Sequence, residues 1–183
     1  MAQDDTRSFI AVELPDNVVQ ELKIVQQDLR KKNLFIGKLT EPENIHLTLK
    51  FLGELDKDKL EKTKVLLSGI RFSHFSARIG KLGVFSDDFV RIIWASLDSK
   101  ELCELQKTID AALSGLFPKD SRFASHITIA RVKKVNDREL LFKTLLGLKI
   151  ENITFNVPRF VLKSSELTPE GPVYSDIEKY SLA

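Results

Sequence analysis

The sequence predicts an α+β fold with two pseudo-symmetric lobes, each an antiparallel sheet with helices, around a central cleft. The first observation is a repeated tetrapeptide, His-Leu-Thr-Leu at residues 46–49 and His-Ile-Thr-Ile at residues 126–129. The second is that the two copies lie 80 residues apart and are flanked by similar strand and helix patterns. Side chains alternate between the two faces of a β-strand, so His and Thr share one face in each copy. We therefore expect one His-x-Thr strand per lobe, both facing the cleft.

The first half of the chain has the pattern of three strands and two helices. Valine and leucine residues from Val18 to Leu29 recur at helical spacing, and Pro15-Asp16 before them is typical of a strand end and a helix N-cap. In chain order the expected elements are a strand at 7–14, a helix ending near Lys32 or Asn33, a loop at 34–43, the first His-x-Thr strand at 45–52 closed by Gly53, a helix capped by Asp56 or Asp58 and ended by Gly69, and a strand at 75–85.

The second half repeats this order. The expected elements are a strand at 89–97, a helix with Asp98 and Glu101 as a capping box, the second His-x-Thr strand after 121–125, a helix at 137–146 capped by Asn136, a strand at 153–161 and a closing hairpin that turns at 168–172. The predicted caps Asp56 and Asn136 lie 80 residues apart, as the histidines do. This spacing predicts an internal duplication within a single domain of residues 1–183.

The composition is that of a globular chain with its own core. Of 183 residues, 43% are hydrophobic and 30% are charged, and the net charge of +2 is too small to indicate nucleic-acid binding by itself. The one cysteine, Cys103, excludes an intrachain disulfide and a cysteine zinc cluster, which favours a reducing compartment. No apolar run approaches the length of a membrane span. We therefore expect a cytoplasmic location and no membrane partner.

Two histidines that face one substrate can accept and donate a proton at the same time, which suits displacement at phosphorus. Thr48 and Thr128, two residues after each histidine, can donate hydrogen bonds to non-bridging phosphate oxygens. His74 lies outside this pattern and is assigned no role. The chain lacks the usual zinc-hydrolase and two-metal ligand patterns, a Walker loop and a Gly-x-Ser-x-Gly elbow. A mechanism of acid and base catalysis without a metal is what remains.

The segments around both histidines strongly resemble the paired signatures of the two-histidine phosphoesterase superfamily. Residues 45–53 read Ile-His-Leu-Thr-Leu-Lys-Phe-Leu-Gly, and residues 125–131 read Ser-His-Ile-Thr-Ile-Ala-Arg. Segments 7–12, 91–94 and 167–174 also look like motifs of this family, so the resemblance covers nearly the whole chain. Within the superfamily, the chain resembles the RNA 2',3'-cyclic phosphodiesterase branch, historically called 2'-5' RNA ligase.

The resemblance implies hydrolysis of a terminal 2',3'-cyclic phosphate on RNA to a 2'-phosphomonoester, without a metal or nucleotide cofactor. By analogy with the family, His126 would activate water and His46 would protonate the leaving 3' oxygen. The reverse reaction would join a cyclic phosphate to a 5'-hydroxyl. The implied partner is an RNA with a cyclic phosphate end, with tRNA halves among the candidates, and a monomer is the default expectation.

Three further residues have competing interpretations. Arg131 matches a family arginine that contacts phosphate, yet five residues after His126 it should point to the opposite face unless the strand bulges or ends. Phe51 has the same offset after His46 and could stack on a terminal base or pack in the core. Tyr174 could line the cleft or close the C-terminal sheet.

Two alternative functions stay open at this point. A binding module could hold a nucleotide or RNA end in the cleft without turning it over, although a pure binder has no need for two proton-transfer groups. An endonuclease without a metal could cleave internal bonds through the 2'-hydroxyl of the substrate, with the same acid and base. Products with cyclic ends, formed from internal RNA bonds, would favour the endonuclease.

Overall fold

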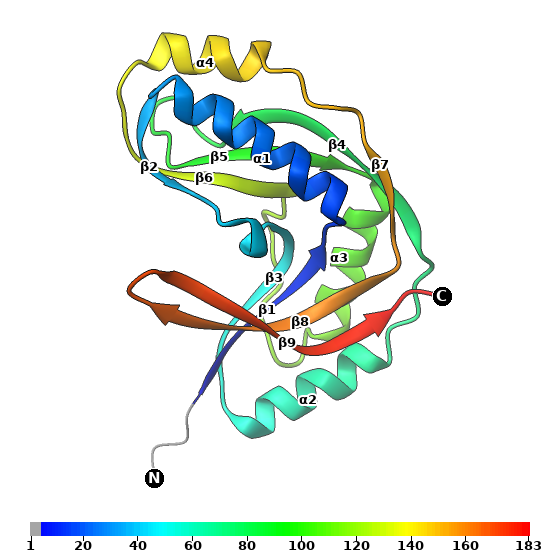
Figure 1. The fold of residues 1–183 in the computed structure, drawn as a ribbon. Helices are drawn as coiled ribbons and strands as arrows, with labels where there is room; N and C mark the ends of the chain where they lie inside the picture. The colour runs from blue at the N-terminus through cyan, green and yellow to red at the C-terminus, as the bar shows by residue number, and fades with distance from the viewer. Residues whose placement is uncertain (1–4) are drawn as a thin grey trace.

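The computed structural model describes residues 5–183, whose strands form one nine-stranded antiparallel sheet (Figure 1). The strands are β1 (Thr6–Glu13), β2 (Phe35–Leu39), β3 (His46–Leu55), β4 (Phe75–Val84), β5 (Ile92–Asp98), β6 (His126–Val135), β7 (Thr154–Val157), β8 (Arg159–Thr168) and β9 (Gly171–Ser181). The helices are α1 (Asp16–Lys31), α2 (Lys57–Ser68), α3 (Lys100–Ala112), α4 (Arg138–Gly147) and the 3₁₀ helix η1 (Pro42–Asn44). None of these helices combines the length and the apolar character needed to cross a membrane.

The sheet is divided into two lobes at the junction of the two His-x-Thr strands. The strand order is β7-β4-β5-β6-β3-β1-β8-β9, and β2 pairs with β6 beside this path. At the junction, the register between β3 and β6 consists of the single pair Leu47 with Ile127. Figure 1 shows β4, β5 and β6 above this point and β8 and β9 below it. The two-lobed α+β fold with one His-x-Thr strand in each lobe is therefore confirmed.

Each lobe is covered by one helix from each half of the chain. Helices α1 and α4 lie against β6 and β4, whereas α2 and α3 lie against β3 (Figure 1). The residues of α1 that were expected to face the core are buried: Val18, Leu22, Val25 and Leu29. In α3, Leu102, Leu105 and Ile109 are buried at the same helical spacing. The internal duplication stays a prediction, and the reciprocal packing of α1 on β6 and α3 on β3 supports it.

The predicted loop at 34–43 is wrong, because β2 and η1 lie there. Strand β2 pairs with β6 from Phe35 opposite Val135 to Leu39 opposite Ala130. Its three central residues are exposed, so it lacks the alternation of buried and exposed residues that marks a half-buried strand in a sequence. Gly37 is needed in this pairing, since a Cβ atom there would lie 2.2 Å from the carbonyl oxygen of Arg131.

Three strand boundaries also differ from the predictions. The strand predicted at 89–97 begins only at Ile92. Gly53 does not end the first His-x-Thr strand, because its φ of 78° accommodates a bulge and β3 continues to Leu55. The strand predicted at 153–161 is broken at Pro158, which has no N–H to donate. Before this proline, β7 pairs with β4 in one lobe, and after it, β8 pairs with β1 in the other lobe.

The helix caps are confirmed in part. Asp56 caps α2, with its carboxylate accepting from the Lys59 N–H at 2.7 Å, and Gly69 follows its last residue. In α4 the cap is Asp137 instead of Asn136, whose side chain donates to the carbonyl of Asn33. In α3 the N-cap position is occupied by Ser99 and not Asp98, and no side chain caps it. The equal spacing of the caps was therefore wrong, while that of the histidines is a fact of the sequence.

Candidate active site

A cleft of about 280 Å³ lies where the two lobes meet. All six residues singled out from the sequence line this cleft: His46, Thr48, Phe51, His126, Thr128 and Arg131. They are contributed by β3 and β6, which come together at the single pair of the junction. The sheet therefore places two histidines, two hydroxyl groups and one guanidinium around one small space.

His46 begins β3 and is held by two hydrogen bonds. Its Nδ1 lies 2.8 Å from the carbonyl oxygen of Asn44, and its Nε2 lies 3.0 Å from the hydroxyl of Thr48. A carbonyl can only accept, so Nδ1 carries a proton. In the neutral ring Nε2 is then the acceptor, and the Thr48 hydroxyl donates to it.

His126 begins β6 and is oriented in the same way. Its Nδ1 lies 2.7 Å from the carbonyl oxygen of Ala124, so this nitrogen is again the donor. The ring of Phe85 packs edge-on against the imidazole, with the centroids 4.7 Å apart. In both histidines the carbonyl two residues earlier engages Nδ1. This leaves Nε2 of His126 for a substrate, whereas Nε2 of His46 accepts from the Thr48 hydroxyl.

The surroundings of the two rings differ. His46 lies between the rings of Phe9 and Tyr174, whose centroids are 5.0 Å and 5.3 Å from its own. Burial, with smaller contributions from the charges of Lys163 and Arg131, lowers the pKa of His46 to about 4, against the raising effect of the Asn44 carbonyl. Near neutral pH the His46 ring is therefore neutral.

Tyr174 lines the cleft, so the first of its two interpretations holds. Its ring stands nearly perpendicular to that of His46, at 88°. Burial raises the pKa of the Tyr174 hydroxyl, against the opposing charges of Arg131 and Arg7. The hydroxyl is therefore protonated in the working range of a histidine pair and can serve as a hydrogen-bond donor.

Arg131 lies on the same face of β6 as His126, because the strand bulges between them. In the register with β5, Trp94 is opposite Thr128 and Ile93 is opposite Ala130, so Ile129 is an extra residue without a partner. The extra residue reverses the alternation, and Arg131 becomes exposed on the cleft side. The bulge explains why Arg131 lies on the cleft side although regular alternation, counted from His126, places it on the opposite face.

Phe51 is turned into the cleft by a matching bulge in β3. In the register with β1, Ala11 is opposite Thr48 and Ile10 is opposite Lys50, so Leu49 is the extra residue. The Phe51 side chain is 73% exposed, which makes the core interpretation wrong. An exposed aromatic ring at the mouth of the cleft is available to stack on a base.

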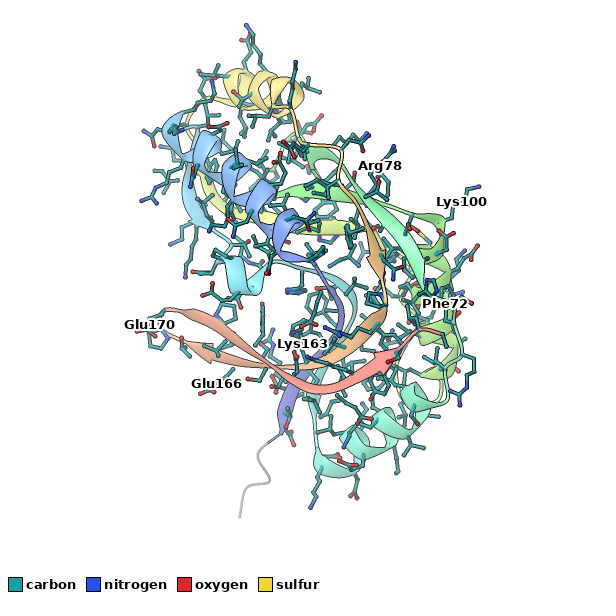
Figure 2. The ribbon with its side chains drawn as sticks, turned by 45° about the vertical axis from the view of Figure 1, so that its right-hand side comes forward. Phe72, Arg78, Lys100, Lys163, Glu166 and Glu170 are labelled. Carbon is teal, nitrogen blue, oxygen red and sulfur yellow. The ribbon has the colours of Figure 1, made fainter. Side chains whose placement is uncertain are left out.

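A larger cavity of about 670 Å³ shares His46 and Tyr174 with the cleft. Its charged groups are largely paired with one another, since Lys163 lies 2.9 Å and Arg159 3.6 Å from carboxylate oxygens of Glu13. Figure 2 shows Lys163 near the centre of the molecule. We place the site in the smaller cleft because both histidines line it.

Several residues of the site had no signal in the sequence. Asn44 and Ala124 act through backbone carbonyls, which any residue type can supply. Phe85, the residue that follows β4, packs against His126, a contact that depends on the order of the strands in the sheet. No three histidine, cysteine or carboxylate side chains within residues 5–183 come together as a set of metal ligands.

The comparisons with known proteins cover almost the whole chain. A family model described as LigT like Phosphoesterase matches residues 12–94 and 97–174. The RNA 2',3'-cyclic phosphodiesterase of Methanocaldococcus jannaschii is 32% identical over 177 residues, which are 95% of this chain and 99% of that protein.

Two solved structures share the fold. The crystal structure of TT0787 of Thermus thermophilus matches with a TM-score of 0.80 and 29% identity, over 96% of this chain and 97% of that one. The crystal structure of E. coli LigT complexed with 3'-AMP matches with a TM-score of 0.77 over 98% of this chain and 99% of that one. At 20% identity, the second likeness is one of fold.

Proposed function

Because the chain belongs to the LigT-like phosphoesterase family, we propose that it hydrolyses the terminal 2',3'-cyclic phosphate of RNA to a 2'-phosphomonoester. The observation that carries this proposal is the pair His46 and His126 in one cleft, each with its Nδ1 engaged by a carbonyl, so that Nε2 is the nitrogen that can exchange a proton with a substrate. The M. jannaschii relative, which bears the name of this activity, supports the choice of substrate.

In the proposed reaction, His126 is the base and His46 is the acid. His126 Nε2 takes a proton from water as the water oxygen bonds to phosphorus. The bond between phosphorus and the ribose 3' oxygen breaks, and His46 Nε2 gives that oxygen a proton. The bond to the 2' oxygen remains, so the product is a 2'-phosphomonoester, and each proton transfer contributes about 10² to 10⁴ in rate.

His46 has to take up the proton that it donates from solvent when the substrate binds. Without substrate, burial holds the pKa of His46 at about 4. The negative charge of a cyclic phosphate favours the protonated imidazole, and the attraction is strong because the ring is poorly solvated. Substrate binding is therefore expected to raise the pKa of His46 toward neutrality.

Thr48, Thr128 and Arg131 hold the phosphate in this proposal. Once His46 is protonated, its Nε2 no longer accepts from the Thr48 hydroxyl, so both hydroxyl groups can donate to non-bridging oxygens. The guanidinium offers a planar pair of donors. Phe51 stacks on the terminal base.

The reverse reaction, catalysed by the same two histidines, would join a cyclic phosphate to a 5'-hydroxyl. Halves of tRNA are candidate RNA substrates. The monomeric state and the cytoplasmic location stay predictions.

The first experiment uses a short RNA that ends in a 2',3'-cyclic phosphate, with EDTA present. Wild type is expected to form the 2'-phosphate, and His46→Ala and His126→Ala are each expected to lose about 10² to 10⁴ in rate. His74→Ala is the matched control, because His74 is exposed and outside the cleft. If wild type binds the RNA and leaves the cyclic end intact, the binding module is the better account.

The direction of proton transfer needs a second substrate. Replacing the ribose 3' oxygen by sulfur creates a leaving group that departs as a thiolate and needs no acid. The defect of His46→Ala should then shrink, while that of His126→Ala should persist. The opposite pattern would exchange the two roles.

A further inference from the structure

The buried side-chain amide of Gln26 binds the β6 bulge that turns Arg131 into the cleft. Gln26 lies on α1 and is 5% exposed. Its Nε2 donates to the carbonyl oxygen of Ile129 at 2.9 Å and to that of Thr40 at 2.7 Å. Ile129 is the extra residue of the β6 bulge. The side chain of Gln26 therefore binds the backbone at the point where the alternation of β6 reverses.

These bonds join the bulged residue to the segment that follows β2. Ile129 has no partner on β5, the strand on one side of β6, whereas its carbonyl is bonded on the other side. Here the Ile129 carbonyl accepts from the Thr40 N–H at 2.9 Å as well as from Gln26. Gln26 also holds the carbonyl of Thr40, which itself lines the cleft. One amide thus ties β6 to the segment that leads to His46.

We propose that Gln26 is a positioning residue, which aims the Arg131 guanidinium at the phosphate of the substrate by holding the β6 bulge. This inference rests on the proposed function, since it concerns how that same site holds phosphate. Gln26 touches no substrate atom in the proposal. It acts through the backbone, two residues before Arg131.

The opposite lobe supplies a matched control. Gln106 lies 80 residues after Gln26, on α3, and is 3% exposed. Its Nε2 donates to the Asp110 carboxylate at 2.9 Å, within its own helix, and makes no bond to β6. Replacing either glutamine by methionine removes a buried amide of similar size. Only the replacement of Gln26 removes a donor from the Arg131 strand.

The test is a double-mutant cycle on the affinity for adenosine 2'-monophosphate, measured by calorimetry. We expect Arg131→Ala to weaken binding by about tenfold to a hundredfold, the worth of a charge-assisted hydrogen bond. Gln26→Met should weaken it by about three- to tenfold, since the arginine remains but is misaimed. In the Arg131→Ala background, Gln26→Met should change the affinity by less than about twofold. Gln106→Met should leave the factor caused by Arg131→Ala unchanged.

The outcomes separate this inference from the proposed function. If Gln26→Met weakens binding equally with and without Arg131, or has no effect, the positioning role is overturned while the phosphate site stands. If wild type neither binds the nucleotide nor hydrolyses the cyclic end, both ideas fail. The Ile129 carbonyl keeps its Thr40 donor in the methionine variant, which favours folding. Gln26→Asn, whose amide is too short to reach Ile129, is the second variant and should show the same coupling.

Discussion

Removing one partner of the buried ion pair between Lys50 and Asp110 should destabilise the fold more than removing both. Both side chains are 4% exposed. The Lys50 ammonium donates to the Asp110 carboxylate and, at 2.9 Å, to the carbonyl of Pro118. Asp110 also accepts from the Gln106 amide and the Asp120 N–H, each at 2.9 Å. The pair lies beneath the β3 bulge, because Lys50 directly follows the extra residue.

The expected cost follows from what each variant leaves behind. Asp110→Ala leaves the Lys50 charge buried with one carbonyl partner, which costs about 3 to 5 kcal/mol. Lys50→Met leaves a carboxylate that keeps two donors, so its cost should be smaller, about 2 to 3 kcal/mol. The double variant Lys50→Met/Asp110→Leu has no buried charge and leaves only the neutral Gln106 amide and Asp120 N–H without their acceptor, so it should cost about 1 to 2 kcal/mol, less than either single variant.

Urea unfolding at pH 7 measures these differences, since the midpoint shifts at constant slope when only stability changes. For a chain of this size, a loss of 3 to 5 kcal/mol lowers Tm by roughly 6 to 20 °C. The reasoning would be refuted if Asp110→Ala cost less than about 1 kcal/mol. It would also be refuted if the double variant lost as much as the sum of the single variants.

Three further outcomes are expected. The folded pKa of His46 is about 4, against 6.5 for a free imidazole, so the unfolded chain binds this proton at a higher pH than the folded chain does. The free energy of unfolding should therefore fall between about pH 6.5 and pH 4, by at most about 3 kcal/mol. Urea unfolding across this range should show the fall in wild type and a smaller one in His46→Gln. Phe51→Ala should weaken binding of a cyclic-ended RNA by about 1 to 3 kcal/mol in a titration while Tm stays unchanged, because the ring is 73% exposed; an equal loss of Tm would contradict the stacking role. Gly37→Ala should separate β2 from β6, since the alanine Cβ would lie 2.2 Å from the Arg131 carbonyl oxygen. Both Tm and the affinity for phosphate should fall, and an unchanged Tm would contradict this expectation.

The local pattern of the sequence was enough to predict the histidine and threonine pairs and the faces of the helices. His46 and Thr48 share a face because side chains alternate along a strand, and this holds over the short stretch from one to the other. Leu22 and Leu29 are buried because a helix returns to the same side at this spacing. Such periodicities need only neighbours in the chain, so they can be read without any knowledge of the fold.

The positions of Arg131 and Phe51 were decided by contacts between distant segments. Each lies beyond a bulge, and a bulge has no local signal when the residues on both sides of it are apolar. The β6 bulge is held by Gln26, more than a hundred residues earlier, and the residue after the β3 bulge is held by Asp110. Periodicity therefore identified the two histidine strands. Which side of each strand Phe51 and Arg131 occupy, five residues after the histidines, depended on the bulges and on the packing of α3 on β3 and of α1 on β6. The physical reason is that a bulge moves backbone and side-chain polar groups out of their regular places in the strand. In both strands a partner from a distant helix binds such a group: Gln26 binds the Ile129 carbonyl, and Asp110 binds Lys50.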